Sequence, residues 1–278
     1  MPPWHRIPFD DTSTMHFTVL TDNRTNDSRL LTEHGLSILL KTERHHFLLD
    51  TGASDVFVRN AEMLGVDLDD VDYVFLSHGH NDHVGGLRYF LNLNQQAKVI
   101  VSPAALSGKF YSKRNSLHSI TTAWPEMARD RLVATSQTIQ VDKGIHVIAH
   151  IPHVHPMPKG NQYLYVQDAN EEYVHDDFCH EQALYAEGLL FTGCAHSGLE
   201  NILAACPWPV HTVVGGFHLI DGQETREELM ELALRLKTNY PRTQFHTSHC
   251  TGDKAFEVMK SIMSEQLQLF SCGTIAQI

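Results

Sequence analysis

The sequence predicts an α/β fold in which two β-sheets pack face to face and helices cover their outer faces, a four-layer αββα sandwich. Short apolar segments of strand length alternate along the chain with amphipathic helical segments. Pairs of neighbouring strands, the pattern of a hairpin, occur at 35–49 and 181–192. A chain of 278 residues, 42% of them hydrophobic, can bury one sizeable core without a second domain. We therefore expect a single domain over residues 1–278.

Hydrophobic periodicity assigns most of the chain to strands or helices. Strands are expected at 15–20, 35–40, 46–49, 71–76, 98–101, 132–133, 138–141, 145–148, 181–186, 189–192, 210–214 and 267–269. Helices are expected at 54–64, 84–93, 199–205, 225–236 and 253–263. Thr225 and Glu228 form a capping box, and Asp253 is expected to cap the last helix. Residues 104–130 have no clear pattern and form either an insertion that covers a site or a polar surface excursion.

Composition excludes several classes of protein. The chain carries 21 basic and 33 acidic residues, a net charge of −12, which argues against a surface that coats nucleic acid. Its five cysteines form no CxxC pair and are odd in number, which is typical of a reducing compartment rather than a disulfide scaffold. No apolar run has the length of a signal-peptide core or a membrane span. A cytoplasmic protein without membrane contact is expected.

The stretch 77–86 concentrates metal-binding side chains directly after the apolar strand at 71–76. His78 and His80 are two residues apart, so in extended backbone both imidazoles point the same way. Asp82 and His83 follow at a turn, where Asp82 is expected to cap a short helix that starts at His83. Imidazole and carboxylate ligands at this density suit Zn, Mn, Fe or Ni. A solvated polar loop is the alternative interpretation.

One loop cannot complete two metal shells, so further ligands must come from elsewhere in the chain. Polar residues that directly follow strands are the candidates, because strand ends converge on one rim of a sheet. His196, His218 and His249 qualify, each flanked by glycine or a small residue. His153 and His155 are competitors, but they belong to a Pro-rich loop that follows a weaker strand.

The HxHxDH pattern after an apolar strand resembles the signature of the metallo-β-lactamase fold. Five motifs together resemble its dihydropterin-ribofuranosylaminobenzene-5′-phosphate synthase-like subfamily: Asp50-Thr51-Gly52, 77–86, 192–198, 215–218 and 248–252. The resemblance implies the fold and two divalent ions. One would be held by His78, His80 and His196, and the other by Asp82, His83 and His249.

The chain departs from the wider superfamily at Cys194, where many members carry a bridging aspartate. The thiolate could bridge two ions, or Cys194 could be a small buried residue. His218 is expected to bind substrate or to transfer a proton, and the alternative is an ordinary hydrogen-bonded histidine beside the site. For Cys250, packing is the preferred interpretation.

Three residues near the motifs have supporting roles in this prediction. Glu33 and His34 are expected to orient ligand imidazoles. Asp50 is expected to hold the histidine loop in place rather than to touch metal.

These residues predict a metal-dependent hydrolase that uses a metal-bound hydroxide at a mono- or dinuclear site, with Asp82 and His218 as catalytic residues. One or two ions per chain are expected, Zn first and Mn, Fe or Ni as alternatives. The expected partner is a small substrate, phosphorylated, heterocyclic or pterin-like. The subfamily name implies instead a synthase that releases diphosphate. A diiron redox or oxygen-binding protein and a non-catalytic metal-dependent sensor are hypotheses from other classes.

Overall fold

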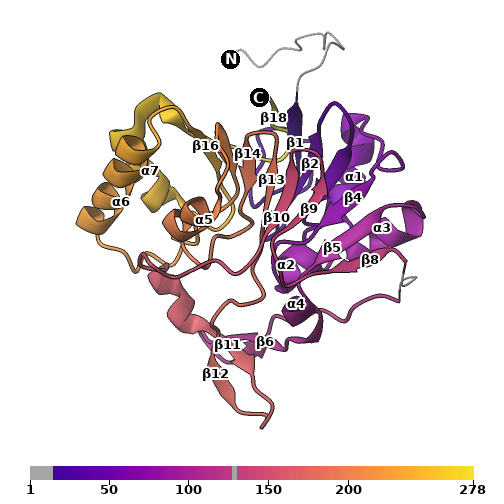
Figure 1. Cartoon of the computed structure of the whole chain (residues 1–278), viewed down its shortest axis with the longest axis horizontal. Coiled ribbons are helices and arrows are strands. Elements are labelled where there is room, and N and C mark those ends of the chain that lie inside the picture. The colour runs from indigo at the N-terminus through magenta and orange to yellow at the C-terminus, as the bar shows by residue number, and fades with distance from the viewer. Residues whose placement is uncertain (1–14, 127–129) are drawn as a thin grey trace.

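A computed structural model describes residues 15–126 and 130–278, and it contains two seven-stranded sheets (Figure 1). The first sheet has the order β18 (Ile275–Gln277), β1 (His16–Thr21), β2 (Ser37–Lys41), β3 (His46–Leu49), β4 (Tyr73–Phe75), β5 (Lys98–Val101) and β8 (Leu132–Ala134). The second has the order β17 (Leu267–Leu269), β16 (Gln244–Thr247), β15 (Thr212–Val214), β14 (Leu189–Phe191), β13 (Ala183–Ala186), β10 (Ile145–Ile148) and β9 (Ile139–Asp142).

Three apolar clusters separate four layers of secondary structure. The first sheet packs one face against α1 (Val56–Leu64) and α3 (Leu87–Leu93). The second sheet packs one face against α5 (Leu199–Ala205), α6 (Arg226–Asn239) and α7 (Asp253–Met263). The remaining faces of the two sheets meet in a third cluster. Neighbouring residues of one strand serve different clusters, as Leu39 and Leu40 do, because side chains alternate across a strand. The predicted αββα sandwich is confirmed.

The two sheets bring the carboxyl ends of their parallel strands to one region. Strands β3, β4 and β5 are parallel neighbours in the first sheet, and β14, β15 and β16 are parallel neighbours in the second. In open α/β sheets, ligands bind beyond the carboxyl ends of such strands. Each motif singled out in the sequence follows one of them: 50–52 after β3, 77–86 after β4, 192–198 after β14, 215–218 after β15 and 248–252 after β16.

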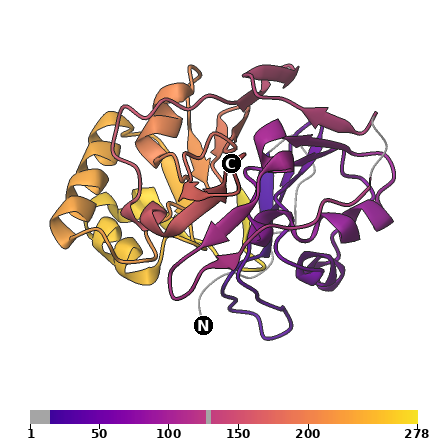
Figure 2. The same cartoon turned by 90° about the horizontal axis from the view of Figure 1, so that it is seen from below.

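A third, four-stranded sheet was missed by sequence analysis. Its order is β12 (Tyr173–His175), β11 (Leu164–Gln167), β6 (Phe110–Ser112) and β7 (His118–Ser119). These strands are only two to four residues long, and β7 and β12 are exposed. Strand β6 pairs with β11, about 50 residues away in the sequence, so local hydrophobic alternation does not mark the sheet. This sheet lies below the sandwich in Figure 1, and seen from below it lies in front of the boundary between the two halves (Figure 2).

Three details of the predicted helices are wrong. The segment expected as one helix at 84–93 is split at Gly85-Gly86 into α2 (Asn81–Val84) and α3. Asp82 lies inside α2 rather than capping it, since His80 is the N-cap residue and makes no side-chain cap bond. Gly252, not Asp253, is the N-cap residue of α7. The Thr225–Glu228 capping box of α6 is confirmed.

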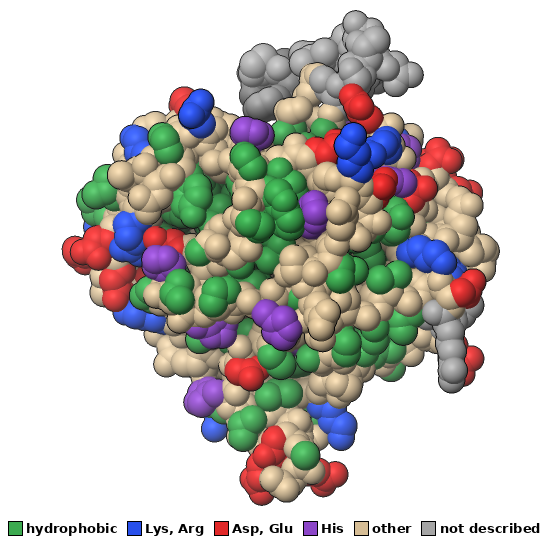
Figure 3. All heavy atoms as spheres, in the orientation of Figure 1, with side chains coloured by type: hydrophobic (Ala, Val, Ile, Leu, Met, Phe, Trp, Pro, Cys, Tyr) green, Lys and Arg blue, Asp and Glu red, His purple; other side chains and the backbone are tan. Residues whose placement is uncertain are grey.

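The charged surface has no single dominant basic area on the face drawn in Figure 3. There, Lys and Arg side chains are scattered among acidic and apolar ones. None of the helices in the described parts of the chain is both long and apolar enough to cross a bilayer.

Candidate metal centre

Three histidines from both sheets enclose one point. His78 and His80 follow β4, and His196 follows β14, so the group joins the two halves of the molecule. Their ring centroids are 4.6 Å (His78–His80), 4.9 Å (His78–His196) and 4.9 Å (His80–His196) apart, and all three residues are buried. One ligand atom from each lies within 4.8 Å of the others.

The Nε2 atoms of these three histidines are buried and have no hydrogen-bond partner among the described residues. Nδ1 of His78 instead lies 2.8 Å from the Ser77 hydroxyl, and Nδ1 of His196 lies 3.1 Å from Asn161 Oδ1. The carboxylate nearest to His80 Nε2, that of Asp176, is 3.9 Å away, too far for a hydrogen bond. Leaving buried nitrogens unpaired is costly, so three at one point indicate a ligand.

A second group stands beside the first. Asp82 Oδ2 lies 3.7 Å from His83 Nε2 and 3.4 Å from His249 Nε2, and the two nitrogens are 3.2 Å apart. Two ligands that are each ~2.1 Å from a tetrahedral ion lie about 3.4 Å from one another. These three atoms therefore have the spacing of ligands around one divalent ion. The His83 and His78 rings are 4.2 Å apart, so the two groups are contiguous.

The backbone is strained where the loops present these side chains. Asp50, Ala195, His218 and His249 have φ values of 56°, 55°, 50° and 50°. A positive φ costs a non-glycine residue conformational energy, and such residues cluster at functional sites. Each lies within a few residues of the end of a parallel strand, so four of the strained residues gather at this rim of the sheets.

Burial keeps the first histidine group neutral. It holds the pKa values of His78 and His196 well below their ordinary value. Burial also lowers the pKa of His80 to about 4, although Asp176 acts in the opposite direction. Because metals bind neutral imidazole, these three rings need lose no proton to accept an ion at neutral pH.

The second group is an ion pair instead. Burial would raise the pKa of Asp82, but the imidazoles of His83, His249 and His34 hold it well below its ordinary value. Burial would lower the pKa of His249, but the Asp82 carboxylate raises it to about 9. An ion that binds here must replace the proton of His249.

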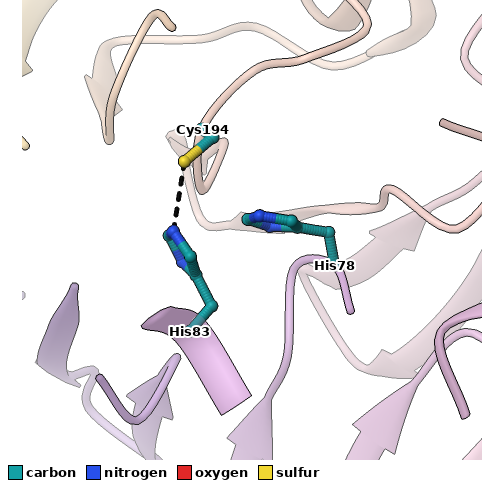
Figure 4. Close-up of side chains that lie close together, drawn as sticks. All are labelled: His78, His83 and Cys194. Atoms are coloured by element: carbon teal, nitrogen blue, oxygen red, sulfur yellow. Dashed lines mark hydrogen bonds between the residues drawn. The ribbon is translucent and has the colours of Figure 1, made fainter. Parts of the chain in front are cut away.

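Two thiols complete the centre. Cys194 Sγ lies 3.1 Å from His83 Nε2 (Figure 4). Cys250 is also buried, and its sulfur accepts the backbone N–H of His218 at 3.3 Å. Burial raises the pKa of Cys194 well above its ordinary value, whereas Cys194 and His218 hold that of Cys250 well below, against the effect of burial. Cys250 thus faces the centre, where sequence analysis preferred packing.

Of the three predicted supporting residues, Asp50 behaves as expected. Its carboxylate accepts the Ser77 N–H at 2.7 Å and the Ser77 O–H at 2.7 Å, and it lies 2.6 Å from His83 Nδ1. It therefore holds the histidine loop at two points.

Glu33 does not orient a ligand imidazole, because it accepts hydrogen bonds from Ala53 N, Ser54 N and Ser54 Oγ. His34 does contact the second group. Its Nε2 is 3.3 Å from Asp82 Oδ2, and its ring stacks on His249 at 5.0 Å.

Several residues that fix the ligands gave no signal in the sequence. Asn23 lies 2.9 Å from His249 Nδ1, and Asn161 lies beside His196. Asp176 and His180 form a buried pair beside His80, with 3.0 Å between His180 Nε2 and Asp176 Oδ2. All four come from segments without a strand or helix pattern of their own.

The competing histidines are not part of the centre. His153 and His155 are exposed, and neither belongs to a ligand-competent group within the described ranges. Asn201 binds the backbone of their loop.

A cavity of about 480 Å³ opens onto the centre. Asp82, His80, His196, Cys194 and Cys250 are part of its lining. The segment that sequence analysis could not assign contributes Ser112, Arg114, Asn115, His118, Ser119 and Ile120.

His218 stands in the same cavity, linked to that segment. Its ring centroid is 4.1 Å from that of His196, and its buried Nδ1 has no partner among the described residues. Its Nε2 is 3.5 Å from Arg114, which binds Asp221 through two hydrogen bonds of 2.8 and 2.9 Å. Arg114 therefore connects the unassigned segment to the loop of His218.

A sandwich of this topology, with its histidines at the strand ends, defines a class of protein. A model of the metallo-beta-lactamase superfamily matches residues 32–170, and the chain belongs to that superfamily, whose members are generally metal-dependent hydrolases that bind divalent metals.

Two proteins of Methanocaldococcus jannaschii are similar over nearly the whole chain. The uncharacterized protein MJ0448 is 27% identical over 266 residues, which cover 94% of this chain and 98% of that protein. The 7,8-dihydropterin-6-methyl-4-(beta-D-ribofuranosyl)-aminobenzene-5'-phosphate synthase is 26% identical over 282 residues, which cover 93% of this chain and 95% of that protein.

Among solved structures, that of Tm1679, described as a metal-dependent hydrolase of the beta-lactamase superfamily, has a TM-score of 0.79 and 27% identity, covering 95% of this chain and 99% of that one. The metallo-beta-lactamase fold protein YhfI from Bacillus subtilis shares the fold, with a TM-score of 0.54 and 12% identity. The match covers 94% of this chain and 99% of that one.

Proposed function

We propose that this protein is a metal-dependent hydrolase of a small phosphorylated or heterocyclic substrate. In this proposal His78, His80 and His196 hold one divalent ion, and Asp82, His83 and His249 hold a second. The observation that carries it is the set of three buried histidines with unpartnered Nε2 atoms and ligand atoms within 4.8 Å of one another, beside the second group. Zinc is the first candidate, with Mn, Fe or Ni as alternatives, because the donors are imidazole and carboxylate.

When bound, such ions lower the pKa of coordinated water to near 7 and polarise an ester oxygen. The chain's own residues supply the rest. Asp82 can orient a water by accepting its hydrogen bond, since it lines the cavity as a carboxylate. His218 can hold or deliver a proton through its unpartnered Nδ1. The cavity volume is in the range that small-molecule sites occupy.

The unassigned segment supports a phosphorylated substrate. In our proposal it covers the site, because it contributes Arg114 and His118 to the cavity lining. A guanidinium suits phosphate oxygens, which it can bind through two hydrogen bonds. Part of its hydrogen-bonding capacity is already taken by Asp221.

Chelation followed by reconstitution tests the function. Phosphodiester and phosphomonoester substrates are assayed with protein as purified, with chelated protein, and with chelated protein given Mn²⁺ or Zn²⁺. Turnover is expected to disappear on chelation and to return with one of the ions. The turnover of His80→Ala, prepared in parallel and given the same ions, is expected to stay as low as that of the chelated protein, which excludes a contaminating phosphatase. Turnover that survives in His80→Ala, or absence of turnover on every ester, contradicts the hydrolase.

The two ligand groups should respond differently to pH. His249, whose pKa is raised to about 9, carries a proton that an ion must displace, so affinity at its group falls as pH falls. Between about pH 8.5 and about pH 7 we expect that affinity to weaken roughly tenfold per pH unit. The group of His78, His80 and His196 is already neutral, so its affinity should stay nearly constant.

Calorimetric titration of metal-free protein with Zn²⁺ at both pH values measures the affinity of each ligand group, which should appear as two binding phases. His249→Ala should remove the pH-dependent phase and keep the other. A single phase, or two phases with the same pH dependence, would contradict the division into a neutral group and an ion pair.

A group transfer is the second candidate. It is favoured by the similarity, over nearly the whole of both chains, to a protein named as a dihydropterin–aminobenzene phosphate synthase. The same metal-binding groups could stabilise diphosphate as it leaves. Release of diphosphate from a dihydropterin methyl diphosphate, dependent on the ribosylated aminobenzene phosphate, would distinguish the transfer from hydrolysis, which needs only the first substrate.

A further inference from the structure

A third group of ligand-competent side chains adjoins the two histidine groups. It consists of Cys194, Cys250 and His218, whose ligand atoms lie within 4.8 Å of one another. The three residues follow the adjacent parallel strands β14, β16 and β15, and each is 4% exposed or less. Two thiols and an imidazole, brought together by three separate loops, are a donor set unlike the histidines and carboxylate beside them.

Features of the backbone favour a ligand site over ordinary packing. The buried Nδ1 of His218 lacks a partner among the described residues, and its residue holds a φ of 50°. A Cβ at Gly216 would collide with Cys250 Sγ, so glycine there leaves room for the sulfur. A buried polar nitrogen without a partner calls for a ligand, and the strained residue that carries it is held in place by the Cys250 sulfur.

We propose that Cys194, Cys250 and His218 form a thiolate-rich site for a thiophilic ion, distinct from the two histidine groups. Two cysteines and one histidine with a fourth position open is a ligand set that catalytic zinc uses in other proteins. Thiolates select zinc or softer ions such as cadmium and copper(I). The metal ligand is the thiolate, so a cysteine that carries a proton loses it when the ion binds.

The open position of this ion would face the substrate cavity, since all three residues line it. It would therefore take one anionic or sulfur donor atom of whatever occupies the cavity. Cys194 can also be shared with the neighbouring group, because its sulfur is 3.1 Å from His83 Nε2. The proposal goes beyond the hydrolase and does not depend on it, but in protein that holds this ion His218 Nδ1 is a ligand and does not transfer a proton.

Cadmium titration of the metal-free, full-length protein tests the site. Cadmium bound by thiolate gives a charge-transfer absorption in the near ultraviolet, which imidazole and carboxylate ligands do not give. We expect this band in the wild type, and loss of about half of it or more in Cys250→Ser and in Cys194→Ser, because each removes one of two thiolates. Cys179→Ser, at an exposed cysteine, is the matched control and should keep the full band. His218→Gln should weaken cadmium binding and keep the band at saturation.

The proposal is overturned if the wild type gives no band, or if Cys250→Ser keeps the full band while Cys194→Ser abolishes it. The second outcome would mean that Cys194 serves the His83 group alone. X-ray absorption of the zinc-loaded wild type needs no variant, so it tests the site even if Cys250→Ser does not fold. A zinc–sulfur shell with two sulfurs at about 2.3 Å is expected, and one sulfur or none contradicts the site. The band does not depend on turnover, so it can be present even if every hydrolase assay fails.

Discussion

Replacing His196 with alanine is expected to remove roughly one equivalent of metal and to lower turnover by about a thousandfold or more, since the bound ion supplies several kcal/mol of transition-state stabilisation. His196 is the member of the first group that the second sheet contributes. Its loss leaves His78 and His80 as two ligands from one loop, too few to hold an ion tightly.

Elemental analysis of protein purified without chelator measures the metal, and the reconstitution assay measures turnover. His155→Ala is the matched control, because His155 is an exposed histidine outside the centre. His196 also stacks on Phe178 at 4.7 Å, so thermal unfolding of both metal-free proteins must be compared. Full metal content in a folded His196→Ala protein would remove this histidine from the metal site.

Replacing Asp50 with asparagine is expected to destabilise the metal-free protein by about 3–5 kcal/mol. An amide cannot replace a carboxylate that is bonded to the Ser77 N–H, the Ser77 hydroxyl and His83 Nδ1, all buried. Asparagine tolerates the positive φ of this position, so the change tests the carboxylate rather than the backbone. Metal affinity at the His83 group should also fall by about 10- to 100-fold, the usual effect of removing a residue that orients a ligand.

Denaturant unfolding of the metal-free proteins measures the loss of stability. Asp142→Asn is the matched control, because Asp142 lies 2.7 Å from His45 Nε2 at the surface. It should cost about 1 kcal/mol or less, the usual value of an exposed pair. Equal effects in the two variants would mean that the Asp50 carboxylate does not brace the histidine loop.

Local chemistry made much of this molecule predictable. The HGHNDH loop can be recognised from the sequence because its candidate ligands are close together and follow a strongly apolar strand. His196, His218 and His249 could be proposed because strand ends converge, and the structure does bring all three to one rim. The layers were predictable because strand alternation and helical periodicity are both local signals.

Other features depend on contacts that sequence periodicity does not encode. Asn23 and Asn161 orient ligand rings from loops far away in sequence, at separations of 226 and 35 residues. The strand pair β6–β11 consists of short segments whose partner choice is set by tertiary structure. Cys250 was judged by its neighbour His249, but the positive φ at His249 alters the direction of the chain between them and lets both side chains face the centre.

The separation of His83 and His249 has a consequence for how the protein is made. Their nitrogens lie 3.2 Å apart although 166 residues of chain separate them. While the ribosome is still translating the segment that carries His249, the nascent polypeptide lacks one member of the Asp82, His83 and His249 group. In our proposal, loading of this second group must therefore follow synthesis of nearly the whole polypeptide, later than loading of the group that ends at His196.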